Sequence, residues 1–304
     1  MLSPGSRALV VRSRRHTSVG PKPPRPGSSV RRELAAIGRH PRKRLGQHFL
    51  ADPQIAERIV RLAAPHAERV VEIGPGLGAL SELLVQGAEE IWLIEVDADL
   101  AQRLRPKFAH LLRVHVVEAD VLAVDFATLL GPGAPAVLVA NLPYNIATAV
   151  LAAALAQARC FSRMVLMLQR EVVERLVAPP GSKTYGALSV LTQFAAQVRP
   201  AFRVAPGAFV PRPKVESEVV IVEPYSTPPV AVADPKLFRD LVRTVFTQRR
   251  KQLVNGVRSL CSDPTETLQR AGIDPMRRPE TLSLSEFAAL SNALAEQDTE
   301  PGSC

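Results

Sequence analysis

Short apolar runs alternate with amphipathic helical segments through the middle of the chain, and this alternation restricts the fold more than any other feature of the sequence. Seven runs have the length and composition of strands, at residues 69–73, 90–95, 114–117, 136–140, 164–168, 198–204 and 218–223. Strands that alternate with helices predict a parallel sheet covered by helices on both faces. We therefore predict an α/β fold with a doubly wound, mostly parallel seven-stranded sheet.

Three segments of different composition predict the domain organisation. Residues 1–40 are rich in Arg, Pro, Ser and Gly and lack apolar periodicity, which is typical of a disordered basic tail. Residues 41–226 contain the predicted sheet. After the break Thr227-Pro228-Pro229 the pattern becomes helical, so residues 227–304 are predicted to form a small all-helical C-terminal domain.

The formal net charge of +9 is concentrated at the amino end. Residues 1–46 contain 12 Lys and Arg against one acid, whereas the remaining chain has 26 basic and 28 acidic residues. A nucleic-acid-binding surface on the folded part must therefore be a local patch. The composition of the tail leaves three interpretations open: an organellar transit peptide, an RNA-attracting arm, or a start codon assigned too early.

Other features of the composition bear on partners and location. No apolar run reaches the length of a membrane span, so no membrane partner is expected. The three cysteines (Cys160, Cys261 and Cys304) are scattered without metal-ligand spacing, which fits a reducing intracellular compartment. We expect a cytoplasmic protein, or a mitochondrial or plastid one if the tail is a transit peptide.

The stretch from Asn141 to Asn145 follows the fourth predicted strand, at the end of a strand where open α/β sheets bind ligands. Pro143 biases Leu142 towards an extended conformation, which can aim backbone carbonyls outward. A planar substrate with an exocyclic amine could stack on Tyr144 and donate its N–H groups to the Asn141 side chain and a nearby carbonyl. For this stretch alone, an ordinary Asn-Pro turn is the alternative interpretation.

A second set of candidates follows the first three strands. Gly74, Gly76 and Gly78 lie between a strand and a helix and would let a nucleotide-like ligand approach the backbone. Glu95 could bind ribose hydroxyls, and Asp120 could accept from an adenine amine or cap a helix. The glycines also fit a dinucleotide-binding fingerprint. A nicotinamide enzyme, however, usually needs a His or Lys acid/base, and all six histidines precede the fourth strand.

Six longer motifs occur in order along the chain, at residues 47–50, 72–78, 141–146, 169–173, 185–190 and 209–215. The set resembles the ribosomal RNA adenine N6,N6-dimethyltransferase family, specifically its bacterial small-subunit (16S) branch, over about residues 43–295. Enzymes that dimethylate large-subunit rRNA are near relatives, but residues 247–253 and Leu142 favour the small-subunit branch. His48 departs from the pattern, since bacterial members often carry Asn there.

The resemblance implies an S-adenosylmethionine-dependent enzyme with a methyltransferase-type sheet. Its substrate would be N6 of two adjacent adenines in small-subunit (16S) rRNA near the 3′ end, each dimethylated during small-subunit biogenesis. The target adenine would lie between the rings of Tyr144 and Phe209, with Asn141 and Leu142 holding its amine. Cofactor contacts are implied for His48, Leu50, Gly74, Gly76, Glu95, Val96, Asp120, Val121 and Asn141.

The implied partner is small-subunit rRNA within a pre-ribosomal small subunit, bound by a monomer that needs no metal. Phosphate contacts are expected from Arg212, Lys214, Arg249, Arg250 and Lys251. The alternatives are a large-subunit rRNA or DNA N6-adenine methyltransferase, and a non-catalytic assembly or organellar transcription factor on the same fold. Because residues 1–40 are predicted to lie outside the fold, we expect their deletion to leave stability and cofactor binding unchanged.

Overall fold

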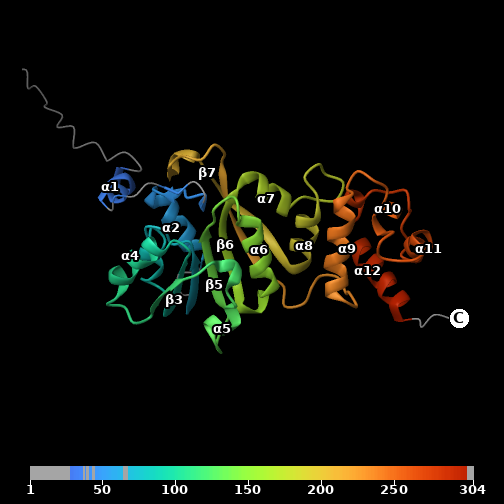
Figure 1. The fold of residues 1–304 in the computed structure, drawn as a ribbon, viewed down its shortest axis with the longest axis horizontal. Coiled ribbons are helices and arrows are strands. Elements are labelled where there is room, and N and C mark those ends of the chain that lie inside the picture. Colours follow the sequence, from blue (N-terminus) through green and yellow to red (C-terminus); the bar gives the residue numbers. More distant parts are fainter. Residues whose placement is uncertain (1–27, 37, 39–40, 43–44, 64–67, 300–304) are drawn as a thin grey trace, which may run out of the picture.

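The structure, a computed structural model, describes residues 28–36, 38, 41–42, 45–63 and 68–299. A central sheet lies between α1 at one end of the molecule and the C-terminal helices at the other (Figure 1). The strands of this sheet are β2 (Arg69–Ile73), β3 (Glu90–Glu95), β4 (Val114–Glu118), β5 (Ala136–Asn141), β6 (Phe161–Gln169), β7 (Ala196–Val204) and β9 (Ser217–Pro224). Two further strands, β1 (Phe49–Leu50) and β8 (Phe209–Val210), form a separate antiparallel pair.

Helices connect most of these strands. The α-helices up to the last strand are α1 (Ser28–Ala36), α2 (Pro53–Leu62), α3 (Ser81–Leu84), α4 (Ala98–Phe108), α5 (Phe126–Leu130), α6 (Ala147–Ala156), α7 (Arg170–Leu176) and α8 (Ala187–Ala195). The C-terminal helices are α9 (Pro235–Thr247), α10 (Leu253–Val257), α11 (Pro264–Arg270) and α12 (Leu284–Thr299). Short 3₁₀ turns are η2 (Val121–Ala123), η3 (Ala158–Cys160), η4 (Pro206–Ala208) and η5 (Pro279–Thr281). Within the described residues, no helix is both long and apolar enough to cross a membrane.

The sheet confirms the predicted α/β fold with a mostly parallel seven-stranded sheet. Its strand order is β4-β3-β2-β5-β6-β9-β7. The first five strands of this order pair in parallel, and β9 pairs antiparallel with both β6 and β7. All seven strands coincide with the predicted apolar runs to within two residues at each end, except that β6 begins three residues earlier.

Alternate residues of the central strands pack into two separate apolar clusters, one on each face of the sheet. Val71, Ile73 and Leu138 face a cluster completed by side chains of α5, α6 and α7. Val70 and Val139 face the other, which α2, α3 and α4 complete. Burial on both faces explains why these strands read as continuous apolar runs and not as alternating patterns.

The strand order reverses between β2 and β5, and this reversal positions the candidate site. From β2 the chain proceeds outward to β3 and β4, whereas β5 lies on the other side of β2 and leads to β6. The parallel register sets Ile73 opposite both Ile94 and Ala140. The next residue along each strand is Gly74, Glu95 and Asn141 respectively. Three predicted site residues therefore leave the sheet side by side at a topological switch point.

Helix α1 corrects the prediction that residues 1–40 form a disordered tail outside the fold. Val30 and Leu34, four residues apart on α1, are only 8% and 6% exposed and pack into an apolar cluster with Phe49. Glu33 forms an ion pair with Arg103 of α4. The sequence gives little indication that α1 packs on the fold, because its two buried apolar residues, Val30 and Leu34, stand among arginines and serines. The transit-peptide and RNA-arm interpretations refer to residues 1–40, of which 1–27, 37 and 39–40 lie outside the described residues.

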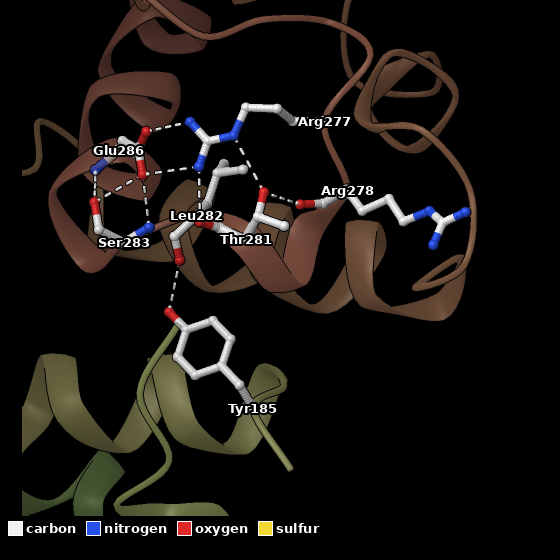
Figure 2. A network of polar contacts seen from close by, with 7 residues as sticks. All are labelled: Tyr185, Arg277, Arg278, Thr281, Leu282, Ser283 and Glu286. Carbon is white, nitrogen blue, oxygen red and sulfur yellow. Dashed lines mark hydrogen bonds and ion pairs between the residues drawn. The ribbon is translucent and has the colours of Figure 1, made fainter. Parts of the chain in front are cut away.

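The C-terminal helices share their apolar core with α8 and the loop that precedes it. Phe194 of α8 packs on Phe238 of α9 with ring centroids 4.4 Å apart. Tyr185 is 1% exposed, and its hydroxyl donates to the Leu282 carbonyl oxygen at 2.9 Å (Figure 2). The all-helical C-terminal segment agrees with the fold prediction. Its apolar core, however, extends across residue 227, so the exact domain boundary stays a prediction.

Replacement of Tyr185 by Phe should lower the free energy of unfolding by about 1–3 kcal/mol, because the buried Leu282 carbonyl loses its donor. Urea unfolding of the two proteins measures this difference. The control is Tyr225→Phe, because Tyr225 is 38% exposed and water can solvate its hydroxyl. Equal effects of the two substitutions would contradict the assigned role of the Tyr185 hydroxyl.

Candidate functional site

A cavity of about 310 Å³ lies at the carboxyl ends of β2, β3 and β5. The segment that precedes β1 and the turn η2 complete its walls. The structure brings into this cavity all nine residues for which a cofactor contact was implied, together with Leu142 and Tyr144. Their individual roles stay predictions, but their convergence from five separate chain segments makes this the candidate active site.

Glu95, the last residue of β3, links two loops of the site. Its side chain is 4% exposed, and its carboxylate oxygens accept from the Gly76 N–H at 3.0 Å and the Asp97 N–H at 2.9 Å. Burial raises the pKa of Glu95, while these two hydrogen bonds act in the opposite direction. The carboxylate is thus held at a fixed place in the wall of the cavity, where it can accept from a hydroxyl group.

The turn after β2 brings bare backbone to the cavity. Gly74 has φ of +67°, and a Cβ atom built there would meet no atom within 4 Å, so the cavity is open at this point. Gly76 has φ of +59°, and a Cβ atom there would lie 3.1 Å from the Phe49 ring. Both positions favour glycine for conformation, and Gly76 also for space.

Asp120 combines the two interpretations that its sequence position left open. It caps the turn η2, where one carboxylate oxygen accepts from the Leu122 N–H at 3.0 Å. It also lines the cavity beside the buried Val121 and the half-exposed Val96. The second carboxylate oxygen can therefore accept from a ligand while the first keeps the turn in place.

Asn141, the last residue of β5, has its amide oriented by the chain itself. Its Nδ2 group donates to the backbone oxygen of His48 at 3.0 Å. This bond directs Oδ1 to act as the acceptor end of the amide. The Leu142 N–H donates to the Met167 oxygen at 3.3 Å, which fixes the peptide that follows. The strand end therefore presents an amide oxygen and a rigid backbone to the cavity.

The rings of Tyr144 and His48 stack on one another at the cavity wall. Their centroids are 5.4 Å apart, with planes inclined by 28°. The Tyr144 hydroxyl forms a hydrogen bond with the Ser217 hydroxyl at 2.7 Å, and burial raises the pKa of the phenol, so it stays neutral. His48 Nδ1 lies 2.8 Å from the Pro211 oxygen, which ties the loop after β8 to the site.

Phe209, the second ring of the predicted sandwich around the base, is buried in this structure, and its contact with a base stays a prediction. Its side chain is 2% exposed and belongs to the apolar cluster of the α2–α4 face. The residue stands opposite Leu50 in the β1–β8 pair and is not among the described residues that line the cavity. In this structure the partner of the Tyr144 ring is His48.

Glu72 is a site residue that the sequence reasoning did not single out. It lines the cavity from within β2, is 1% exposed, and accepts from the Ser81 hydroxyl at 2.6 Å. Burial, with a smaller contribution from the Glu95 charge, raises the pKa of Glu72 to about 8. The available signal was an acid inside the otherwise apolar run Val70–Ile73.

The predicted phosphate-binding residues separate into two kinds. Arg212 and Lys214 are exposed on the loop that His48 holds through Pro211, and Arg250 and Lys251 are exposed after α9. Arg249 differs, because the residue is half-buried and its guanidinium donates to the Lys183 oxygen at 2.7 Å. It thereby links the segment after α9 to the loop before α8, and its phosphate contact stays a prediction.

Comparison with known families agrees with this geometry. The sequence profile of the family described as ribosomal RNA adenine dimethylase matches residues 38–296. The chain belongs to this family. A Magnetococcus marinus protein named ribosomal RNA small subunit methyltransferase A is 46% identical over 261 residues, which are 85% of this chain and 94% of that protein. A protein of the same name from Pseudomonas aeruginosa is 44% identical over 256 residues, or 84% and 95% of the two chains.

Solved structures of similar shape agree on the fold of this dimethylase. A dimethyladenosine transferase from Plasmodium falciparum superposes with a TM-score of 0.66 at 23% identity, covering 80% of this chain and 96% of the other. A 23S rRNA methyltransferase gives 0.62 at 24% identity, with coverage of 81% and 99%. At such low identity, these likenesses support the methyltransferase fold alone.

As a member of the adenine dimethylase family, the protein is an S-adenosylmethionine-dependent rRNA adenine N6,N6-dimethyltransferase, and its cavity fits that cofactor. Glu95 and Asp120 line the cavity, whereas no Lys or Arg does so within the described residues. Such a lining suits a nucleoside with a cationic sulfonium and ammonium group better than a pyrophosphate. Glu95 can accept from ribose hydroxyls, Asp120 from the adenine amine, and Gly74 leaves room beside its backbone.

The buried carboxyl of Glu72 should make stability depend on pH. In the unfolded chain this group ionises near pH 4.5, whereas the folded protein retains the proton up to about pH 8. Between these values the folded state binds more protons, so its free energy of unfolding falls as pH rises, by up to ~1.4 kcal/mol per pH unit. In Glu72→Gln this contribution should disappear. Urea unfolding of both proteins at pH 5, 6, 7 and 8 without cofactor measures the difference, and identical slopes would contradict the assigned proton.

Proposed function

We propose that this protein transfers methyl groups to N6 of two adjacent adenines near the 3′ end of small-subunit (16S) rRNA and dimethylates each. The observation that carries the proposal is the orientation of Asn141, whose amide oxygen lies in the same cavity as Glu95. The names of the relatives from Magnetococcus marinus and Pseudomonas aeruginosa support small-subunit rRNA as the substrate.

The chain supplies acceptors for the amine that reacts. The N6 lone pair of adenine is delocalised into the ring and is a weak nucleophile. Hydrogen bonds from N6–H to Asn141 Oδ1 and to the Leu142 carbonyl favour a pyramidal nitrogen with a more localised lone pair. When bound, S-adenosylmethionine supplies an electrophilic methyl group on its sulfonium. A site that holds the amine in line with this methyl group gains most of its rate from proximity and orientation.

The neutral charge of Asn141 suits a reaction that occurs twice on one nitrogen. A carboxylate in its place would bind the amine more strongly through a charge-assisted hydrogen bond. The amide binds it more weakly, so the once-methylated amine can rotate and present its remaining hydrogen. The acceptor oxygen itself stays in place, because Nδ2 is held by the His48 backbone oxygen at 3.0 Å.

The target base must leave its stack to enter the cavity, because chemistry on a stacked base is inaccessible. The face of the Tyr144 ring offers a stacking surface for it at the cavity wall. Arg212 and Lys214 are exposed on the adjacent loop, where they can contact phosphates without specifying sequence. Arg250 and Lys251 on the C-terminal segment would contact phosphates farther along the RNA.

The partner in this proposal is a pre-ribosomal small subunit in the cytoplasm, which a monomer of the enzyme binds during assembly. Residues 47–304 have 26 basic and 28 acidic residues, so the basic residues just named form a local patch and not a general RNA surface. Such a patch favours recognition of a structured RNA over binding to any RNA.

The test is methyl transfer to three substrates: small subunits from cells that lack this modification, the free small-subunit rRNA, and large subunits. The proposal predicts that small-subunit material accepts about four methyl groups, because two adenines each take two. Mass spectrometry of RNA fragments should locate them on adjacent adenines near the 3′ end. Transfer to large subunits instead, or to isolated adenines elsewhere, would contradict the proposal.

A further inference from the structure

Helix α1 lies outside the part of the chain that matches the adenine dimethylase family, which begins at residue 38. It nevertheless packs against the folded enzyme. Val30 and Leu34 are buried in one apolar cluster with Phe49, Leu77, Leu100 and Val210. Figure 1 shows α1 at the end of the molecule that is far from the C-terminal helices. The helix is therefore an addition to the family fold at its cofactor-binding end.

The side chains that α1 covers are themselves walls of the cavity. Phe49, Leu77 and Leu100 each line the cavity and also belong to the cluster around Val30 and Leu34. They come from β1, from the turn after β2 and from α4 respectively. The Phe49 ring also lies close to Gly76, since a Cβ atom at Gly76 would be 3.1 Å away from it. Packing of α1 against one side of these three side chains therefore affects the shape of the cavity on their other side.

The β1–β8 pair is held on one side by the α2–α4 cluster, to which Leu50 and Phe209 belong, and on the other by the cluster around α1. Each of the two strands has only two residues, with Phe49 opposite Val210 and Leu50 opposite Phe209. An isolated two-stranded pair is at best marginally stable in water, and one of only two residues per strand needs packing to persist. The cluster around α1 contains one residue from each strand, Phe49 and Val210. The helix therefore packs against both strands at once.

Polar contacts also attach the segment between α1 and β1 to the rest of the fold. Arg42 forms ion pairs with Asp97 at 3.1 Å and with Asp99 at 2.8 Å. Gln47 Nε2 donates to Asp97 at 3.2 Å. Asp97 in turn donates its backbone N–H to Glu95. The segment that follows α1 is therefore anchored to Asp97, which is hydrogen-bonded to Glu95, the residue proposed to bind the ribose.

We propose that α1 is a positioning element for the S-adenosylmethionine site, acting through Val30 and Leu34. The helix packs behind Phe49, Leu77 and Leu100 and so favours the arrangement in which His48 and Leu50 close over the glycine turn. If the closed arrangement is only partly populated without α1, the apparent affinity falls by that fraction. The helix touches neither cofactor nor RNA in this proposal. The proposal rests on the assignment of S-adenosylmethionine as the cofactor and not on the identity of the RNA.

Cofactor affinity of targeted variants tests the proposal directly. Three variants are compared with the full chain by calorimetric titration with S-adenosylmethionine at a temperature well below unfolding. Deletion of residues 1–27 should leave the affinity unchanged. Deletion of residues 1–36, and the double substitution Val30→Ala with Leu34→Ala, should each weaken binding roughly fivefold to tenfold. Wild-type affinity in both of the last two proteins would overturn the proposal.

The matched control separates positioning from general stability. Leu294→Ala removes a side chain of the C-terminal apolar core that is 2% exposed. It should lower the melting temperature at least as much as the α1 substitutions while S-adenosylmethionine affinity stays at the wild-type value. An equal loss of affinity in Leu294→Ala would show that α1 acts only through overall stability, which would overturn the positioning role.

Hydrogen exchange in the unaltered protein provides a second measurement that does not depend on variants folding. Coupling between two sites is reciprocal, so a cofactor that favours the packed arrangement must also stabilise α1. Saturation with S-adenosylmethionine should therefore slow exchange of the backbone amides of residues 30–36. Exchange in α1 that is unchanged by the cofactor, while amides of the glycine turn are protected, would overturn the proposal.

Discussion

The parallel pairing of β2 with β5 is the constraint on which the rest of the structure depends. Val70 to Ile73 stand opposite Val137 to Ala140, so the two chains leave the sheet at the same level. Connections from these two strands proceed in opposite directions along the sheet, which opens a crevice at the carboxyl ends of the strands. A glycine turn and the strand-end Asn141 meet in that crevice because of this register. A shift of one residue would reverse every side chain of the strand between the two faces.

Two backbone-to-side-chain arrangements then hold the reactive groups at fixed positions. Glu95 accepts two backbone N–H groups, and Asn141 donates to the His48 backbone. In the proposed function, the protein thus uses its own chain to orient an acid for the cofactor and an amide oxygen for the base. Such preorganised groups need no rearrangement when the substrates bind. Glu72 beside them is 1% exposed, and this burial raises its pKa to about 8.

The sequence could predict the sheet and most of the cavity because both depend on local patterns. Strands buried on two faces are continuous apolar runs, and residues that follow such runs converge when the strands are parallel. Phe209 and α1 depend instead on pairing between distant segments. Phe209 stands opposite Leu50 in the β1–β8 pair, and Val30 and Leu34 pack where β1, β8 and α4 meet. Likewise, Arg249 is held by carbonyls of a loop more than sixty residues away.

The central claim is that Glu95 serves the cofactor and Asn141 serves the base within one cavity. The most direct test is the rate of methyl transfer as a function of S-adenosylmethionine concentration in Glu95→Ala and Asn141→Ala. In Glu95→Ala the KM for the cofactor should rise about tenfold to hundredfold, with kcat largely recovered at saturation. Asn141→Ala should lose kcat by at least about a hundredfold at any cofactor concentration. Recovery of the Asn141→Ala rate by excess cofactor would contradict the account.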